Sequence, residues 1–569
     1  MKQYQVKNIN SGATFTVNEG ESVLNAALRQ GVMLPYSCKN GTCGSCKGQL
    51  ESGEVHYPFH PPLALSREEI GEGRALFCQA EPTGDLVCAN KEDVAAAISK
   101  ARAAQPAWSA TSPQERAAII KRALQLVLAR QDEIIETVVA ETGKAKTDAM
   151  TMEVFSVADS LCYYAKHAEE FLKARKRRVH GVLGLVKQLR IVYKPLGVIG
   201  LITPWNGPFV LVMNQAVQAI LAGNTVVAKG SEVTPFSARL AETILLDAGL
   251  PRDVLQVLLG DGDTGAAIVR GGVDKVSFTG SVATGRKVAE ACASQLIPCT
   301  LELGGNDAMI VCADADLDRA ADGAWLGSCM NTGHYCCGTE RIYVIAEVYE
   351  EFLRLVLEKG KNLKQGQEHG WEEDIGAVFW DRQMAIIEAH VEDARAKGAT
   401  VQLGGKRNSQ LTGLYYEPTV ITEVTNEMDI MLLETFGPIL CIQKVANEEE
   451  AIRLANDSEF GLNGNVWTRD KSKGYRLATA IDTGACSVND MAVSYGIPAA
   501  PFGGKKKSGL GQVNGKKGLR GYCHEMPIVI DRFGGKMQNA YPYTAKSAEG
   551  MRKLMNFLWV QTPLGRWLS

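Results

Sequence analysis

Four cysteines in the first ninety residues have a spacing that suits metal chemistry. Cys38, Cys43 and Cys46 share a glycine-rich loop with C-x4-C-x2-C spacing, and Cys78 follows further along the chain. Four thiolates with this spacing typically hold a [2Fe–2S] cluster. Zinc sites usually divide their ligands between two short clips, so zinc is the less favoured alternative, and incidental buried thiols rank lower still.

The same segment resembles the ferredoxin module at the N-terminus of oxygenase reductases. The resemblance rests on Cys43-Gly44-Ser45-Cys46-Lys47 and on Phe77-Cys78-Gln79-Ala80-Glu81-Pro82. It implies an α+β, β-grasp ferredoxin domain whose [2Fe–2S] cluster is held by the four cysteines. In those reductases a flavin domain and a nicotinamide domain follow, and neither pattern follows here.

Two glycine-rich turns further along could bind a phosphate. Residues 260–265, Gly-Asp-Gly-Asp-Thr-Gly, fit G-x-G-x-x-G, but two aspartates would repel a pyrophosphate, so a structural turn is favoured. The turn from Phe278 to Gly285 has no acid and offers hydroxyl and N–H groups at a predicted helix start. The second turn is therefore the better anion site.

Apolar strands and amphipathic helices alternate around these turns. The pattern predicts strands at 197–202, 225–229, 255–259 and 275–278, with helices at 210–222 and 235–248. Such alternation is typical of a doubly wound parallel sheet, whose ligand crevice lies at the carboxyl ends of the strands.

Seven short motifs follow one another over residues 204–504. They are Pro204-Trp205-Asn206, Lys229 with Glu232, Phe278 to Ser281, Glu302-Leu303-Gly304-Gly305, Gly333-His334-Tyr335-Cys336, Glu434-Thr435-Phe436-Gly437-Pro438 and Pro501-Phe502-Gly503-Gly504. In these motifs the segment from about Lys91 to Arg532 resembles the NAD(P)-dependent aldehyde dehydrogenase superfamily. The resemblance implies an α/β fold with a Rossmann-like cofactor domain, an α/β catalytic domain and a small oligomerisation β element.

These resemblances predict five units along the chain. They are a [2Fe–2S] ferredoxin-like domain at 1–89, a mainly NAD(P)-binding domain at 91–302, a catalytic domain at 303–485, a return to the cofactor domain with the oligomerisation strand at 486–540, and an amphipathic tail at 546–569.

The resemblance also implies three catalytic roles. Cys336 is the nucleophile that forms a thiohemiacetal and then a thioester, and its neighbour Cys337 is the less favoured alternative. The Asn206 side chain and the Cys336 backbone N–H stabilise the oxyanion. Glu302 is the general base that activates water. Coenzyme-A-acylating relatives lack this glutamate, so we expect a non-acylating enzyme that oxidises an aldehyde to a carboxylic acid.

Seven further residues are implied to bind the dinucleotide. They are Lys229 and Glu232 for the adenosine ribose, Gly280 and Ser281 for the pyrophosphate, Glu434 for the nicotinamide ribose with Phe436 beside that ring, and Trp205, which is assigned to the dinucleotide as a whole. An acid three residues after the lysine favours NAD over NADP, because a ribose 2′-phosphate would meet its negative charge. NADP stays the alternative.

Length and composition are those of a large globular protein. The chain has 569 residues, several times the size of one domain, and 61 basic against 64 acidic residues give a net charge of −3. No positive excess is available to attract nucleic acid. We find neither a membrane-spanning apolar run nor a signal-peptide pattern at Met1, and fifteen cysteines are too unevenly spread for a disulfide scaffold. We therefore predict a cytoplasmic location.

The C-terminal tail mixes basic residues with Trp, Phe and Leu, from Met551 to Val560 and again at Arg566-Trp567-Leu568. It could lie in a membrane interface, cap a hydrophobic substrate channel, or pack on a neighbouring subunit, and the last is favoured. The apolar residues of the tail also favour a moderately hydrophobic aldehyde as the substrate. A homodimer or homotetramer is expected by resemblance.

The two kinds of redox chemistry in one chain need an explanation. Hydride transfer moves two electrons together, an iron–sulfur cluster accepts one, and we find no flavin module to convert between them. We expect the ferredoxin module to serve a separate redox partner, such as a ferredoxin reductase or an oxygenase. The alternatives are a structural or assembly role for the cluster domain, or an electron carrier on an inactive scaffold, which intact Cys336, Glu302 and Asn206 argue against.

Overall fold

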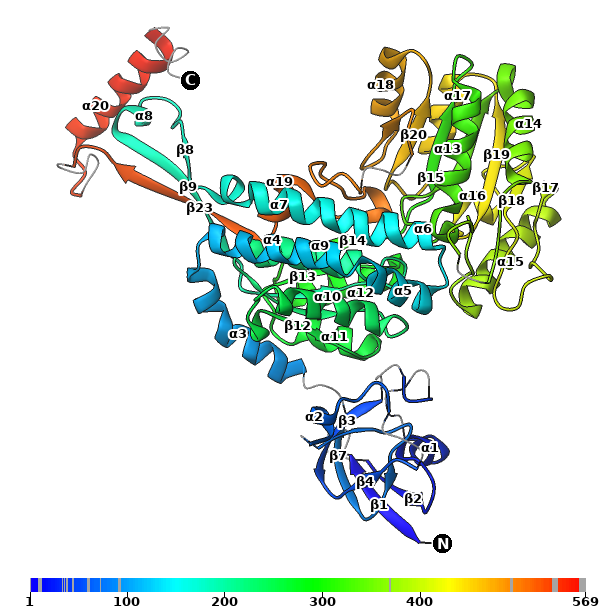
Figure 1. The fold of residues 1–569 in the computed structure, drawn as a ribbon. Helices are drawn as coiled ribbons and strands as arrows, with labels where there is room; N and C mark the ends of the chain where they lie inside the picture. Colours follow the sequence, from blue (N-terminus) through cyan, green and yellow to red (C-terminus); the bar gives the residue numbers. More distant parts are fainter. Residues whose placement is uncertain are drawn as a thin grey trace.

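The computed structural model describes most of the chain, and Figure 1 shows its course. The described residues are 2–8, 13–32, 34, 36, 39–42, 46–58, 62–71, 73–90, 94–367, 370–491, 495–534 and 541–561. Two of the candidate cluster ligands, Cys38 and Cys43, and residues 562–569 of the tail lie outside them.

The N-terminal unit is a mixed five-stranded sheet with a helix packed against it (Figure 1). Its strands, in the order β2-β1-β7-β3-β5, are β2 Thr14–Asn18, β1 Gln3–Asn8, β7 Leu86–Asn90, β3 Lys47–Ser52 and β5 Arg74–Leu76. Helix α1 (Val23–Arg29) begins at Ser22, whose hydroxyl accepts the Asn25 N–H. A short second helix, α2, spans Arg67–Gly71, and β4 (Val55–His56) pairs with β6 (Glu81–Pro82). This unit has its own apolar core, drawn from residues 6–86.

The second unit contains a six-stranded sheet. Its strands, in the order β12-β11-β10-β13-β14-β22, are β12 Leu255–Leu258, β11 Thr225–Lys229, β10 Val198–Ile202, β13 Lys275–Thr279, β14 Cys299–Glu302 and β22 Gly509–Leu510. All neighbours are parallel except β14 and β22. The four strands predicted from the sequence agree with the structure to within one residue at each end.

Helices cover both faces of this sheet, because its strands are apolar on both sides. In β10, Ile199 and Leu201 enter one core, and Val198 and Ile202 enter the other. The first core is completed by α4 Pro113–Ala129, α5 Gln131–Thr142, α7 Ser156–Leu172, α9 Val210–Leu221 and α10 Pro235–Asp247. The second is completed by α3 Val94–Ala110, α11 Gly262–Arg270 and α12 Val282–Ser294. This is the predicted doubly wound architecture.

A third unit is built on a seven-stranded sheet, at the right of Figure 1. Its strands, in the order β17-β18-β19-β16-β15-β20-β21, are β17 Thr400–Leu403, β18 Thr419–Thr422, β19 Ile439–Val445, β16 Thr339–Ile345, β15 Asp307–Val311, β20 Gly464–Trp467 and β21 Ser487–Val488. The accompanying helices are α13 Leu317–Cys329, α14 Tyr349–Gly360, α15 Asp381–Ala396, α16 Asp429–Leu432, α17 Glu448–Asn456 and α18 Lys471–Ala480. Alternate residues of β15 enter two separate cores, so this sheet is also covered on both faces.

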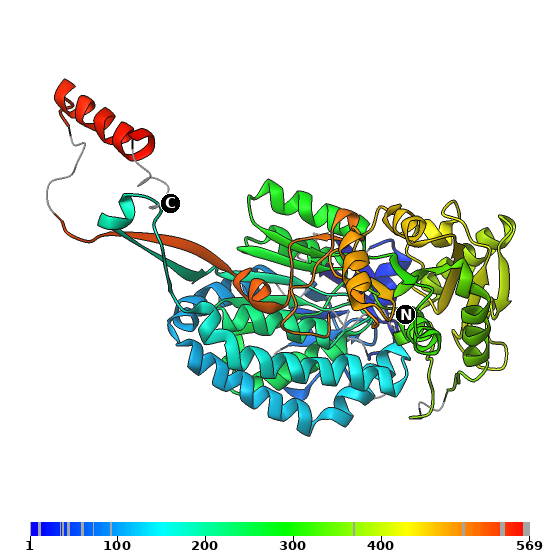
Figure 2. The same cartoon turned by 90° about the horizontal axis from the view of Figure 1, so that it is seen from above.

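A long antiparallel arm projects from the body of the molecule, as Figures 1 and 2 show. It consists of β8 Arg175–Arg177, β9 Lys187–Pro195 and β23 Cys523–Asp531, with α8 (Leu183–Val186) at the turn between β8 and β9. Helix α19 (Gly515–Arg520) precedes β23, and α20 (Ala545–Asn556) follows it near the end of the arm. Among the helices described, none combines the length and apolarity needed to cross a bilayer.

Candidate active site

A cavity of about 430 Å³ is lined by most of the catalytic and dinucleotide-binding residues predicted from the sequence. Its lining includes eight of the ten candidate catalytic and dinucleotide-binding residues: Trp205, Asn206, Gly280, Ser281, Glu302, Cys336, Glu434 and Phe436. The other two, Lys229 and Glu232, lie outside that lining and form an ion pair of 2.8 Å with each other. Segments far apart in the chain therefore meet at one place.

The order of the parallel strands explains this convergence. Lys229, Thr279 and Glu302 stand at the carboxyl ends of β11, β13 and β14, which lie in one sheet with β10 between the first two. Residues that follow parallel strands emerge at the same sheet edge. Asn206 follows β10 at this edge, and Cys336 approaches it from the loop before β16.

The loop that carries Cys336 has an unusual backbone. Asn331, Thr332 and Gly333 have φ angles of 55°, 58° and 77°. A Cβ on Gly333 would lie 2.1 Å from the Gly437 carbonyl oxygen, so only glycine fits there. The strained turn brings the nucleophile loop against the segment that carries Glu434 and Phe436.

The two adjacent cysteines have different surroundings. Cys336 is half-buried and lines the cavity, whereas Cys337 is 1% exposed and packs in an apolar cluster with Phe502 and Val513. A hydrogen bond with the Cys337 thiol, together with burial, raises the pKa of Cys336 well above its usual range. The geometry supports Cys336 as the reactive thiol and Cys337 as a core residue.

Glu302 is the last residue of β14, and its carboxylate lacks polar contacts with the described residues. It is 6% exposed, and neither of its carboxyl oxygens has a hydrogen-bond partner within the described part of the chain. Burial raises the pKa of Glu302 well above its usual range, and the nearby Cys336 adds to this. A carboxylate with high proton affinity at a cavity wall is suited to accept a proton.

The amide of Asn206 is oriented by hydrogen bonds. Its Nδ2 donates to the His334 carbonyl oxygen at 3.1 Å, which leaves the second N–H of the amide for another acceptor. Its own backbone carbonyl accepts from Lys144 Nζ at 2.9 Å and from Asn331 Nδ2 at 2.8 Å. Asn331 Nδ2 also donates to the His334 carbonyl at 2.8 Å, so it joins the two loops.

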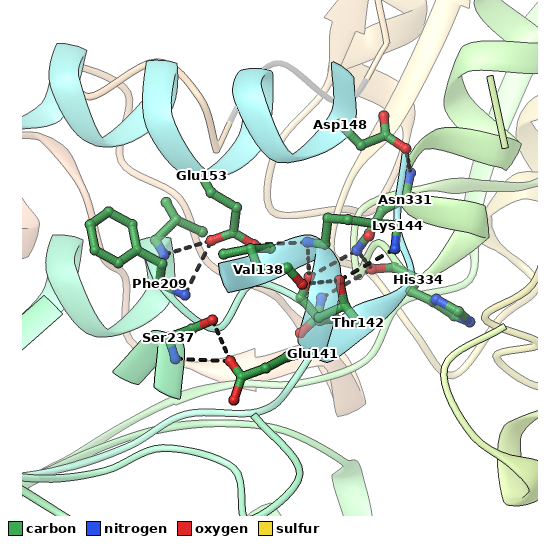
Figure 3. A network of polar contacts seen from close by, with 12 residues as sticks. Val138, Glu141, Thr142, Lys144, Asp148, Glu153, Phe209, Ser237, Asn331 and His334 are labelled. Carbon is green, nitrogen blue, oxygen red and sulfur yellow. Dashed lines mark hydrogen bonds and ion pairs between the residues drawn. The ribbon is translucent and has the colours of Figure 1, made fainter. Parts of the chain in front are cut away.

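Behind Asn206 lies a buried ion pair, shown in Figure 3. Lys144 Nζ is 2.8 Å from Glu153 Oε1, and the side chains are 2% and 0% exposed. Glu153 Oε2 accepts the backbone N–H groups of Phe209 and Val210, at 3.2 and 2.8 Å, where α9 begins. The pair therefore fixes both the start of α9 and the Asn206 backbone. The sequence reasoning missed Lys144, Glu153 and Asn331, because no local motif marks them.

Glu340 binds the backbone of the segment that carries Glu434 and Phe436. The sequence analysis did not predict this role for Glu340. The Glu340 carboxylate accepts the N–H of Thr435 at 2.9 Å and that of Phe436 at 2.9 Å, and Phe436 has a φ of 54°. Burial raises the pKa of Glu340 to about 7 and that of Glu434 to about 8. Glu434 Oε1 accepts the Gly305 N–H at 2.9 Å.

Aromatic rings and a neutral histidine complete this wall. Trp205 stacks on Phe379, with ring centroids 4.6 Å apart, and meets Phe436 edge to face at 5.8 Å. His334 is 3% exposed and packs against Trp205 and Phe436. Burial lowers the pKa of His334 to about 3, so the ring is uncharged at neutral pH.

The second glycine-rich turn has the features of a dinucleotide phosphate site. Ser281 caps α12 by accepting the Thr284 N–H, and Gly280, Ser281 and Thr284 line the cavity at the start of this helix. The first N–H groups of a helix are free to bind an anion. In the first turn Asp261 instead caps α11 by accepting from Asp263 and Thr264, as expected for a structural turn.

Two of the four candidate cluster ligands lie side by side. Cys46 and Cys78 are 3% and 8% exposed, and the Cys78 backbone N–H donates to Cys46 Sγ at 3.3 Å. An N–H group aimed at sulfur is the kind of contact that stabilises a cluster thiolate. Cys38 and Cys43 fall outside the described residues, so their positions stay predictions.

Comparison with known protein families and structures agrees with this picture. Residues 77–527 match the model of the aldehyde dehydrogenase family, and residues 7–83 match that of the 2Fe-2S iron-sulfur cluster binding domain. The chain therefore belongs to the aldehyde dehydrogenase family and carries an N-terminal [2Fe–2S] domain, with NAD(P) and the cluster as its cofactors.

Individual relatives cover most of the chain. A Mycolicibacterium smegmatis protein provisionally named succinate-semialdehyde dehydrogenase [NADP(+)] is 39% identical over 82% of this chain and 88% of its own. The 4,4'-diapolycopene aldehyde oxidase of Methylomonas sp is 36% identical over 81% of this chain and 86% of its own. The crystal structure of a Mycobacterium tuberculosis aldehyde dehydrogenase complexed with NAD+ has a TM-score of 0.75 and 34% identity, covering 80% of this chain and 94% of that chain.

We predict that Lys144→Met lowers kcat about 10- to 100-fold with little change in the KM for NAD+, because Asn206 loses one of the donors that position it. Steady-state kinetics with both substrates varied checks this. The exposed Lys121→Met is the matched control.

The single variant also leaves the Glu153 charge buried without its partner, which destabilises the fold. The double variant Lys144→Met/Glu153→Gln removes both charges and is still expected to have a low kcat. A double variant with a native circular dichroism spectrum and wild-type kcat would contradict a positioning role for Lys144.

Proposed function

We propose that this protein oxidises an uncharged, apolar aldehyde to its carboxylic acid with NAD+, and that its cluster domain passes single electrons to a separate redox protein. The proposed aldehyde oxidation is supported by one observation. Cys336, Glu302 and Asn206 line the same cavity as five of the candidate dinucleotide-binding residues.

The proposed chemistry begins with Cys336. Its sulfur attacks the aldehyde carbon, and the oxyanion that forms accepts hydrogen bonds from Asn206 Nδ2 and the Cys336 N–H. When NAD+ is bound, its nicotinamide ring accepts the hydride that leaves this carbon. Glu302 then takes a proton from water, which attacks the thioester carbon and releases the acid and the thiol. The sum is aldehyde, NAD+ and water giving acid, NADH and a proton.

The lining of the cavity supports an uncharged substrate. Beside the catalytic residues it presents Met152, Val210, Leu211, Tyr335 and Tyr495. Among the described lining residues, Arg382 is the sole cation. The adjacent Gln383 donates to the carbonyls of Thr435 and Phe436, which places this stretch of α15 at the proposed dinucleotide side.

The names of the two relatives indicate substrates of different charge. Succinate semialdehyde carries a carboxylate, whereas 4,4'-diapolycopene aldehyde is an apolar polyene. The apolar lining favours the second kind of substrate for this chain. For the cofactor we propose NAD+, because Glu232, held 2.8 Å from Lys229, would repel a 2′-phosphate.

We also propose that copies of the chain associate through the arm, as a dimer or tetramer in the cytoplasm. β23 is an edge strand of nine residues in the order β23-β9-β8, so its outer backbone groups are available to pair with another chain.

Glu302→Gln is expected to lower steady-state NADH formation about 10²- to 10⁴-fold, because water is no longer deprotonated. Wild-type turnover should rise with pH, since Glu302 becomes the active base only as it loses its proton through its raised pKa. Glu302→Gln should lack that rise and release one NADH per site in a burst. Stopped-flow assays measure both, with the exposed Glu290→Gln as control. Normal turnover of the variant without coenzyme A would show that Glu302 is not the base.

For the substrate, we expect kcat/KM to be at least about 10-fold higher for medium-chain and aromatic aldehydes than for succinate semialdehyde. A panel assayed with NAD+ and with NADP+ measures this, and Cys336→Ser should be inactive towards every member. A preference for succinate semialdehyde would contradict the substrate assignment while leaving the dehydrogenase chemistry intact.

For the cluster, anaerobic titration with a reductase or dithionite is expected to bleach the visible absorption, because a redox-active [2Fe–2S] centre accepts one electron. Cys78→Ser should lose the visible bands and keep NADH formation from aldehydes. Exposed Cys162→Ser should keep both properties. Visible bands that no donor bleaches would favour a structural cluster instead.

A further inference from the structure

The two oxyanion donors of the proposed reaction belong to different units of the molecule. Asn206 follows β10 of the six-stranded sheet, and Cys336 precedes β16 of the seven-stranded sheet. Two donors stabilise an oxyanion only when both lie within hydrogen-bond distance of the same oxygen atom. Contacts between the two units must therefore set the distance between these donors.

The side chain of Asn331 joins the two loops that carry the donors. Its Nδ2 donates to the Asn206 carbonyl oxygen and to the His334 carbonyl oxygen, at 2.8 Å in each case. An amide nitrogen has two hydrogens, so both are used. The orientation of the Asn331 side chain therefore sets the spacing between the loop after β10 and the loop before β16.

The backbone at Asn331 needs support from elsewhere in the molecule. Its φ and ψ angles are 55° and 36°, in the left-handed region that is unfavourable for a residue with a Cβ atom. Asn331 is also 2% exposed, so its backbone N–H requires a hydrogen-bond acceptor inside the protein. Losing that acceptor would leave a buried donor unpaired in a strained turn.

Asp148 supplies this acceptor from the cofactor unit. Its Oδ2 accepts the Asn331 N–H at 2.9 Å, as Figure 3 shows. Asp148 ends the short helix α6 (Lys146–Asp148), and a π-helix (Ala149–Phe155) follows directly. Ala149 and Val154 of the π-helix enter the core of the cofactor unit, so Asp148 is anchored on the side of Asn206.

The burial of Asp148 has no local explanation. It stands at the start of the π-helix, but its side chain makes no capping hydrogen bond there. The neighbouring Lys144 pairs with Glu153 instead. Within the described part of the chain, the Asn331 N–H is the only donor to the Asp148 carboxylate. Burial raises the pKa of Asp148 to about 6, so the carboxylate is ionised at neutral pH and acts only as an acceptor.

From these contacts we propose that Asp148 is a positioning residue for the oxyanion site. By accepting the Asn331 N–H it holds the left-handed turn, and the turn holds the Asn331 amide between the two loops. The Asn206 amide and the Cys336 N–H then point at the same oxygen of the substrate. Asp148 does not line the cavity, so it acts through Asn331 and does not touch the reacting atoms.

The role of Asp148 rests on the proposed aldehyde oxidation, because the oxyanion forms only in that reaction. It does not rest on the class of substrate, so the assay uses whichever aldehyde the wild type oxidises fastest. A preference for succinate semialdehyde would change the substrate assignment alone. The rates of the Asp148 and Asn331 variants bear only on the positioning role.

The experiment measures the NADH burst in a Glu302→Gln background, where the reaction stops at the thioester. The burst then reports the steps that use the oxyanion donors. Asp148→Ala is expected to lower the burst rate constant about 10- to 100-fold, because a small displacement of the donors is enough for such a loss. The dissociation constant of NAD+ should change less than about 2-fold, since neither Asp148 nor Asn331 lines the cavity. Asp132→Ala, at an exposed position of α5, serves as the control.

The conservative variant Asp148→Asn separates the hydrogen bond from the charge. The oxygen of the new amide can accept the same N–H, so the burst rate constant should stay within about 3-fold of the wild-type value. Asp148→Asn as slow as Asp148→Ala would overturn the proposal. So would an Asp148→Ala variant with a native circular dichroism spectrum and the burst rate constant of Asp132→Ala.

Asn331→Gly provides a second measurement, which decides the matter if Asp148→Ala does not fold. Glycine adopts the positive φ angle without strain and keeps the N–H for Asp148, but it removes the amide that joins the two loops. The burst rate constant is expected to fall about 10- to 100-fold in this variant as well. A wild-type burst rate constant in Asn331→Gly would show that the Asp148–Asn331 contact does not position the donors.

Discussion

The proposed chemistry depends on holding the Glu302 carboxylate, which has no hydrogen-bond partner among the described residues, at the wall of the cavity that Cys336 also lines. Removing Glu302 from water is unfavourable for its charged form, and this unfavourable energy appears as a raised pKa. A well-solvated glutamate would be a far weaker base. The fold must therefore supply the energy that keeps Glu302 buried, and it does so by making it the last residue of β14, which lies between β13 and β22 in the sheet.

Other lining residues of the cavity are positioned by contacts made outside its lining. Lys144 and Glu153 form a buried ion pair that holds the start of α9 and the Asn206 carbonyl together. Glu340 holds the backbone on which Phe436 adopts a positive φ. In both places a buried carboxylate accepts backbone N–H groups, and Glu153 is also paired with the Lys144 cation. The positive φ angle of Asn331 is held by hydrogen bonds of its own, from its backbone N–H to Asp148 Oδ2 and from its Nδ2 to the Asn206 carbonyl.

The [2Fe–2S] domain and the antiparallel arm form sheets of their own, separate from the six-stranded and seven-stranded sheets. The [2Fe–2S] domain has its own apolar core, and a cluster of this kind accepts one electron at a time, whereas hydride transfer moves two together. The arm projects from the body of the molecule and has β23 as an edge strand. In the proposed function, aldehyde oxidation and one-electron transfer therefore take place in separate units of one chain.

Local pattern in the sequence determined a large share of this architecture. Apolar runs and turn residues located the strands of the cofactor sheet to within a residue, and the motif order identified eight residues that line one cavity. Motifs of this kind are readable because they combine short-range periodicity with a chemistry that tolerates few residue types.

Tertiary structure alone decided which polar residues support the site. The Asn331 backbone N–H donates to Asp148 Oδ2, 183 positions away in the sequence. Lys144 Nζ donates to the Asn206 carbonyl oxygen, 62 positions away. Tertiary structure also decided the surroundings of Cys336 and Cys337, between which the sequence motif already preferred Cys336: one lines the cavity wall and the other packs in an apolar core. The physical reason is that burial and pairing are properties of the space around a side chain, and that space is formed by segments whose own sequences carry no sign of the contact.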